Sequence, residues 1–71
     1  MNLSDIFARN LHAIRIQKHL TQQMLARSAC VSVSYISMLE RGQRSPALET
    51  IELLAKALGV APIALLRKAH S

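Results

Sequence analysis

The segment from Leu20 to Gly42 constrains the fold of this chain more than any other part of the sequence. Thr21 and Ser32 are residue types that favour helix N-caps, and Gly42 is typical of the position that follows a helix. They delimit two short amphipathic helices, at 21–29 and 32–41. A connection of only about three residues cannot fold the second helix back antiparallel to the first, so the pair must cross at a steep angle.

Three further helices are predicted around this pair. Apolar residues recur at spacings of three and four in the segment 4–19, with Ser4 as the expected N-cap and His19 in the last turn. Gly59 ends a helix at 47–58, and Pro62 begins a short one at 62–68. The residues expected to face inward from the first and fourth helices are Leu3, Phe7, Leu11, Ile14, Leu48, Ile51, Leu54, Ala55 and Leu58.

No strand pattern, repeat or low-complexity linker interrupts this order of elements. The sequence therefore predicts one all-α domain over residues 1–71, a compact bundle of five short helices. A chain of this size buries only about 60% of the surface that its unfolded form exposes. Its aromatic residues are Phe7 and Tyr35 alone. Such a small core would gain stability from dimerisation.

The charge balance favours a polyanionic partner. Nine Lys and Arg residues against four Asp and Glu give a formal charge of +5, which suits nucleic acid or an anionic lipid surface. No apolar stretch approaches the roughly 18 residues of a membrane span. The N-terminus, with Asp5 and Arg9, does not resemble a signal peptide. We therefore expect a cytoplasmic protein that is prokaryotic or phage-encoded and makes no membrane contact.

Several site chemistries are excluded by the residues present. The single cysteine, Cys30, rules out an internal disulfide and a CxxC zinc site. His12 and His19 are spaced without a carboxylate or thiol partner, so we expect them to face solvent and predict no metal or cofactor. The serines at 32–37 have no neighbouring His–Asp arrangement that would activate a nucleophile. We do not expect an enzyme.

A specific pattern of residues covers most of the chain. It consists of Leu20-Thr21-Gln22, Leu25-Ala26, Ala29, Val31-Ser32, Tyr35-Ile36-Ser37, Leu39-Glu40-Arg41-Gly42, Arg44, Pro46, Leu48-Glu49-Thr50 and Leu54-Ala55-Lys56-Ala57-Leu58-Gly59-Val60. With this pattern the chain resembles the phage repressor and Cro-type (XRE) helix-turn-helix regulators over roughly residues 7–66. The resemblance implies a lambda-repressor-like DNA-binding domain, with the helix-turn-helix at about 21–41.

The resemblance also implies roles for individual residues. Positions that reach base edges from the recognition helix are occupied by Val33, Ser34, Ser37 and Met38. Contacts with the sugar-phosphate backbone are implied for Gln22, Ser32, Tyr35, Arg41, Gln43 and Arg44. The amide of Gln22 would also cap the adjoining backbone. Arg15 and Glu40 match a partly buried ion pair that joins the first helix to the third and braces the recognition helix.

Two positions depart from the family pattern. Cys30 stands where relatives usually carry glycine, at a turn that favours a left-handed backbone. The recognition helix offers hydroxyl and apolar groups where relatives often place Gln, Asn or Arg. Hydroxyls discriminate weakly between bases, whereas Val33 and Met38 can contact thymine methyl groups. We therefore expect much of the specificity to come from those methyl groups and from DNA shape.

Apolar residues outside the core stripes suggest a twofold interface. Leu53, Ile63, Leu65 and Leu66 come from the two helices farthest along the chain from the recognition helix. A homodimer built through them would place two recognition helices about 34 Å apart, on a pseudo-palindromic operator.

The resulting prediction is a dimeric, sequence-specific double-stranded DNA-binding regulator of repressor or controller type. The main competing hypothesis is an antitoxin that neutralises a partner toxin and autoregulates its promoter. A toxin or polymerase is thus a candidate protein partner. Two weaker hypotheses are a module that binds only protein and a piece of a larger regulator, although Met1 and the ending Lys68-Ala69-His70-Ser71 fit a full reading frame.

Overall fold

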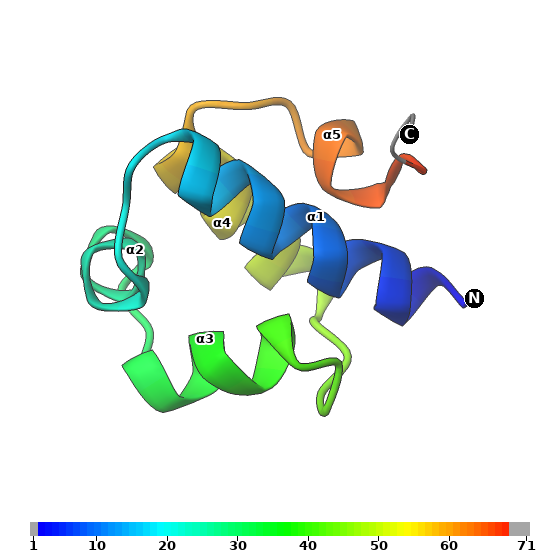
Figure 1. Ribbon diagram of the computed structural model, residues 1–71, viewed down its shortest axis with the longest axis horizontal. Helices are drawn as coiled ribbons and strands as arrows, with labels where there is room; N and C mark the ends of the chain where they lie inside the picture. Colours follow the sequence, from blue (N-terminus) through cyan, green and yellow to red (C-terminus); the bar gives the residue numbers. More distant parts are fainter. Residues whose placement is uncertain (1, 69–71) are drawn as a thin grey trace.

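A computed structural model describes residues 2–68 of the chain and contains five helices there, with no strand among these residues (Figure 1). The helices are α1 (Leu3–Gln17), α2 (Gln22–Ala29), α3 (Val33–Glu40), α4 (Leu48–Leu58) and α5 (Ile63–Leu66). The predicted all-α class and the order of five helices are confirmed. The predicted domain limits, residues 1 and 71, lie outside the described residues.

The helix-turn-helix pair is capped as the sequence predicts. The Thr21 hydroxyl accepts a hydrogen bond from the amide of Met24 at 3.0 Å, and the Ser32 hydroxyl accepts one from the amide of Tyr35 at 3.1 Å. Between the two helices, Cys30 takes the left-handed conformation, with φ 58° and ψ 43°. In Figure 1, α2 is seen end-on while α3 lies across the view, so the two helices cross steeply.

Both ends of α1 differ from the prediction. The N-cap is Asn2, whose side-chain oxygen accepts from the Asp5 amide at 2.9 Å. Ser4 lies inside the first turn, and its hydroxyl is 2.8 Å from that of Ser45 in the α3–α4 loop. At the other end, the helix stops at Gln17 because His19 adopts a positive φ of 60°. Asn and Ser are about equally good caps, so local sequence did not separate Asn2 from Ser4.

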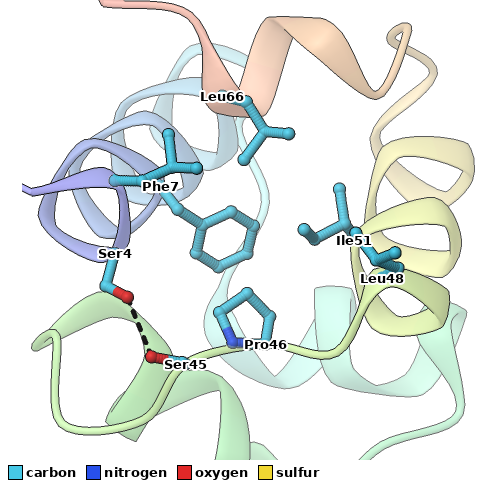
Figure 2. Close-up of a pocket in the computed structure, with 8 residues that line it drawn as sticks. Ser4, Phe7, Ser45, Pro46, Leu48, Ile51 and Leu66 are labelled. Carbon is cyan, nitrogen blue, oxygen red and sulfur yellow. Dashed lines mark hydrogen bonds between the residues drawn. The ribbon is translucent and has the colours of Figure 1, made fainter.

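The core lies where all five helices meet. Its buried residues are Phe7, Leu11, Leu25, Ala26, Ala29, Ile36, Leu39, Ile51, Leu54, Ala55, Leu58 and Leu65. Two residues predicted to face inward do not: Leu3 is 57% exposed and Leu48 is 75% exposed. Both lie in the first turn of a helix, where they border a shallow pocket whose inner wall includes Phe7 and Ile51 (Figure 2).

The short helix α5 closes the core, contrary to one part of the dimer prediction. Leu65 is fully buried against the other helices, so it is not available to a second subunit, and its assignment to the interface is wrong. The buried side chain of Asn10 fixes this helix, since its Nδ2 donates to the carbonyl oxygens of Leu65 at 2.9 Å and Arg67 at 2.8 Å. The helix ends at Leu66, earlier than predicted, because Arg67 takes an extended backbone.

Candidate nucleic-acid interface

The outer face of α3 is the surface on which the predicted base-contacting residues gather. Ile36 and Leu39 are completely buried and fix one side of the helix on the core. The opposite side is open: Val33 is 42% exposed, Ser34 is exposed, and Ser37 and Met38 are half-buried. These last four residues line one shallow hollow together with Gln22 and Arg41. Figure 1 shows α3 along one edge of the molecule, α5 near the opposite edge and α1 between them.

An ion pair holds the end of α3 against α1. Arg15 donates through Nε to Oε2 of Glu40 at 2.6 Å and through Nη2 to Oε1 at 3.0 Å, so the contact is bidentate. Its Nη1 also donates to the carbonyl oxygen of Leu20 at 2.8 Å. The Glu40 side chain is only 4% exposed and that of Arg15 only 9%. The structure thus brings the predicted pair into contact and ties it to the turn that precedes α2.

Two further side chains contact the carboxylate of Glu40. Gln22 donates from Nε2 to Oε1 at 3.1 Å, and Nδ1 of His12 lies 3.0 Å from the same oxygen. Burial raises the pKa of the Glu40 carboxyl, but hydrogen bonds from Arg15, His12 and Gln22 and the charge of Arg15 lower it more. Its pKa is therefore below the ordinary value of 4.5.

The contact between Gln22 and Glu40 replaces an expected one. The sequence predicted that the Gln22 amide would cap the adjoining backbone, but the structure gives that amide to Glu40, and Thr21 caps the helix. An amide nitrogen has two hydrogens. With one of them held by Glu40, the other remains for a ligand at the start of α2.

The residues after α3 form a cationic loop beside the exposed helix face. Gly42 takes a φ of +72°, and the amide of Gln43 bonds to the carbonyl oxygen of Met38 at 2.9 Å, which turns the chain away from the helix axis. Arg41 and Arg44 are both exposed. The guanidinium of Arg44 lies 5.9 Å from the centre of the Tyr35 ring, within the range of a cation–π contact.

Two structurally important residues were not found from the sequence. His12 was expected to face solvent alone, yet it bonds to Glu40 although its side chain is 56% exposed. Its spacing of three from Arg15 places both on one face of α1, which is the local signal that could have found it. Asn10 is a buried amide within an apolar stripe, and its partners are backbone groups far along the chain.

Two other observations bear on the kind of site. Within residues 2–68, no helix is both long enough and apolar enough to cross a membrane. The same part of the chain contains no group of three or more His, Cys, Asp or Glu residues arranged to hold a metal ion. The chemistry that the surface does offer is hydroxyl, amide, apolar and guanidinium.

A steeply crossed helix pair with a capped, exposed second helix and flanking cations defines a helix-turn-helix DNA-binding domain. The helix-turn-helix family model matches residues 11–65. The chain belongs to this family and is a DNA-binding transcriptional regulator of the phage repressor and Cro type.

Known proteins of similar length resemble the chain along most of its sequence. The control protein C.BamHI from Bacillus amyloliquefaciens is 39% identical over 62 residues, which cover 86% of this chain and 76% of that protein. The crystal structure of the hypothetical transcription factor NHTF from Neisseria matches with a TM-score of 0.91 and 37% identity, over 94% of this chain and 77% of that one. The restriction-modification controller protein C.AhdI from Aeromonas hydrophila matches with a TM-score of 0.85 and 37% identity, over 87% and 94%.

Proposed function

We propose that the chain is a homodimeric, sequence-specific regulator whose α3 enters the major groove of double-stranded DNA. The observation that carries this proposal is the open face of α3, where Val33, Ser34, Ser37 and Met38 line one hollow between Gln22 and Arg41. Small side chains at the start of the helix allow close approach to base edges. Two of the relatives above are named control or controller proteins, which supports a controller or repressor role in the cytoplasm of a prokaryotic cell.

Phosphate contacts would come from groups that the fold already holds in place. The second amide hydrogen of Gln22 and the hydroxyl hydrogen of Ser32 are donors at the starts of α2 and α3, where helix N-termini also favour anions. Arg41 and Gln43 follow α3, and Arg44 is placed by the ring of Tyr35. These contacts carry no sequence information, but they supply affinity and fix the register of α3.

Base discrimination would rest on apolar contacts. Val33 and Met38 can pack against thymine methyl groups, while Ser34 and Ser37 accept from or donate to several bases. Replacing the contacted thymines by uracil should weaken binding by up to about 0.8 kcal/mol per methyl group. Equal affinity for the thymine and uracil half-sites would count against this mode of recognition.

The dimer would use apolar side chains that remain outside the core. Leu53 is 49% exposed on α4, Ile63 is 60% exposed on α5, and Leu66 is half-buried. With Leu65 removed from the interface, these three residues are its proposed centre. None of the relatives named above is named as an antitoxin, so these comparisons do not favour a toxin partner.

The proposal is tested by selecting bound duplexes from a random pool. A dimer of this kind should enrich a pseudo-palindrome with half-site centres about 34 Å apart. On the selected site, Arg44→Gln should weaken binding to all sequences alike and reduce the slope of log affinity against log salt by about one. Lys56→Gln, at an exposed position of α4, removes the same charge and is the matched control. A pool that stays random after selection would refute the proposal.

A further inference from the structure

A second cationic surface lies on the side of α1 that faces away from α3. Arg15 points toward α3, where it binds Glu40. Ala13 and Gln17 are each two residues from Arg15, about 200° around the helix, and so lie on the opposite side. There α1 packs against α5, and the two helices border a hollow of about 580 Å³. In Figure 1, α5 and α3 lie on opposite sides of α1.

This hollow, the cationic groove, combines an apolar floor with a charged rim. Its apolar lining residues, here called the floor, are Ala13, Ile14, Val60 and Ala64. Its cationic lining residues, here called the rim, are Lys18, Arg67 and Lys68. All four Asp and Glu side chains of the chain lie within the described residues, and none of them lines the groove. The rim charges are therefore not neutralised by a carboxylate side chain at the groove.

Hydrogen bonds from a buried side chain fix one wall of the groove. Asn10 is 6% exposed and uses both hydrogens of its side-chain amide to bind the carbonyl oxygens of Leu65 and Arg67. These bonds fix the backbone at the end of α5 beside α1. The backbone of Arg67 is thus anchored, so less backbone entropy is lost when a ligand binds its side chain.

We propose that the cationic groove binds an acidic, partly apolar peptide segment of a partner protein. Carboxylates of that segment would pair with Arg67, Lys18 and Lys68, and an apolar side chain between them would lie on the floor. The volume falls within the range of about 300–1,000 Å³ that is typical of sites for small ligands. Duplex DNA fits the groove poorly for two reasons. DNA binds protein elements that protrude into its own grooves, and its phosphate backbone has no apolar group to pack on the floor of this hollow.

The inference goes beyond the proposed DNA-binding function, since the groove is on the far side of the molecule from α3. A partner held there could contact the regulator while α3 occupies the operator. Charge complementarity would also raise the association rate of this partner, and the increase would be largest at low salt concentration.

The test uses the full chain labelled with ¹⁵N and a short peptide, blocked at both ends, that alternates Asp and Leu. Peptide should shift the amide signals of Ala13, Val60 and Ala64 and leave those of Ser34 and Ser37 unchanged. Arg67→Gln should reduce peptide affinity roughly fivefold, and Lys18→Gln is a second variant should the first not fold. Lys56→Gln, with the same net charge, should bind peptide as the parent does. Peptides with Asn for Asp, or Ser for Leu, should both bind more weakly.

Four results would overturn the proposal. The first is an equal loss of peptide affinity in Lys56→Gln and Arg67→Gln, and the second is a set of peptide-induced shifts centred on α3. The third is displacement of the peptide from the groove by duplex DNA. The fourth is a set of shifts at the groove that depend on protein concentration alone, which would indicate that a second copy of the chain binds there. Arg67→Gln should still bind the selected operator like the parent. That measurement separates failure of this inference from failure of the DNA-binding proposal.

Discussion

The strained backbone conformation of Cys30 lowers the stability of this small domain. It joins α2 to α3 with a φ of 58°, a value that L-residues adopt only with steric strain of roughly 1–2 kcal/mol. Because the side chain is exposed, no packing offsets the strain.

Cys30→Gly should therefore stabilise the fold. Relief of strain is partly offset by the greater freedom of glycine in the unfolded chain, about 0.4–1 kcal/mol. The net gain should be roughly 0.5–1 kcal/mol, or a few degrees in melting temperature. Thermal denaturation followed by circular dichroism measures it. Ser28→Gly, within α2, is the control and should lower the melting temperature, and a Cys30→Gly protein that melts below the parent would contradict the prediction.

Glu40 should give the protein a specific sensitivity to acid. Its pKa is below 4.5 when folded, so the folded state takes up a proton there less readily than the unfolded chain. The stability that Glu40 contributes is then complete above about pH 5 and is lost as the pH falls through the folded pKa. Urea denaturation between neutral and acid pH should show this loss, and the carboxyl carbon signal of Glu40 should titrate below its ordinary range.

The variant Glu40→Gln should flatten that pH profile. At neutral pH it leaves the Arg15 guanidinium nearly buried without its carboxylate, which costs about 3 kcal/mol. Glu52→Gln, on the exposed side of α4, is the matched control and should keep the parent's dependence on pH. Parallel profiles for Glu40→Gln and the parent would show that the acid sensitivity arises elsewhere.

At the scale of elements, α5 has more influence on the core than its length suggests. Leu65 is fully buried, whereas Ile63, in the same helix, is 60% exposed. Leu65→Ala should lower the free energy of unfolding by about 2–5 kcal/mol, most of what a domain of this size has. Ile63→Ala should change it by less than about 0.5 kcal/mol in the monomer. Urea denaturation at low protein concentration compares them, and equal losses would mean that Leu65 is not a core residue.

The elements that sequence predicted well are those whose limits are set locally. Thr21 and Ser32 cap α2 and α3, and Gly42 and Gly59 take positive φ at helix ends, because these preferences belong to single residues. The face of α5 could not be predicted in the same way. One helical turn carries no periodicity, so nothing in Ile63-Ala64-Leu65-Leu66 distinguishes core from surface.

The candidate site was predictable to a similar extent. The resemblance to known regulators pointed to Arg15 and Glu40, and the structure joins them. The bonds of Gln22 and His12 to Glu40 depend on how α1, α2 and α3 meet, which no local pattern encodes. Contacts of the α3 face with DNA remain predictions.

At the scale of the whole molecule, five of the nine Lys and Arg residues form two clusters on opposite surfaces. Arg41 and Arg44 flank α3, while Lys18, Arg67 and Lys68 surround the groove beyond α1. Only the first set can face the same duplex as α3. The steep salt dependence expected of DNA binding should therefore depend on the α3 side, and the net charge of +5 overstates the charge that meets DNA.

A dimer would present the α3 surface twice, related by a twofold axis. A single domain of this size makes too few contacts to select one site strongly, whereas two copies about 34 Å apart can read both halves of a palindrome.

Leu53→Glu places a charge at the proposed interface, where the twofold axis brings it near its own copy. We expect sedimentation to show a monomer, with affinity lost for the palindrome but retained for a half-site. Ile16→Glu, on α1, changes an apolar residue of similar exposure, 52% against 49%, that is not part of the proposed interface, so this matched control should sediment as the parent does. Unchanged sedimentation of Leu53→Glu would remove Leu53 from the interface, and loss of half-site binding would show that the variant had damaged the fold rather than the dimer.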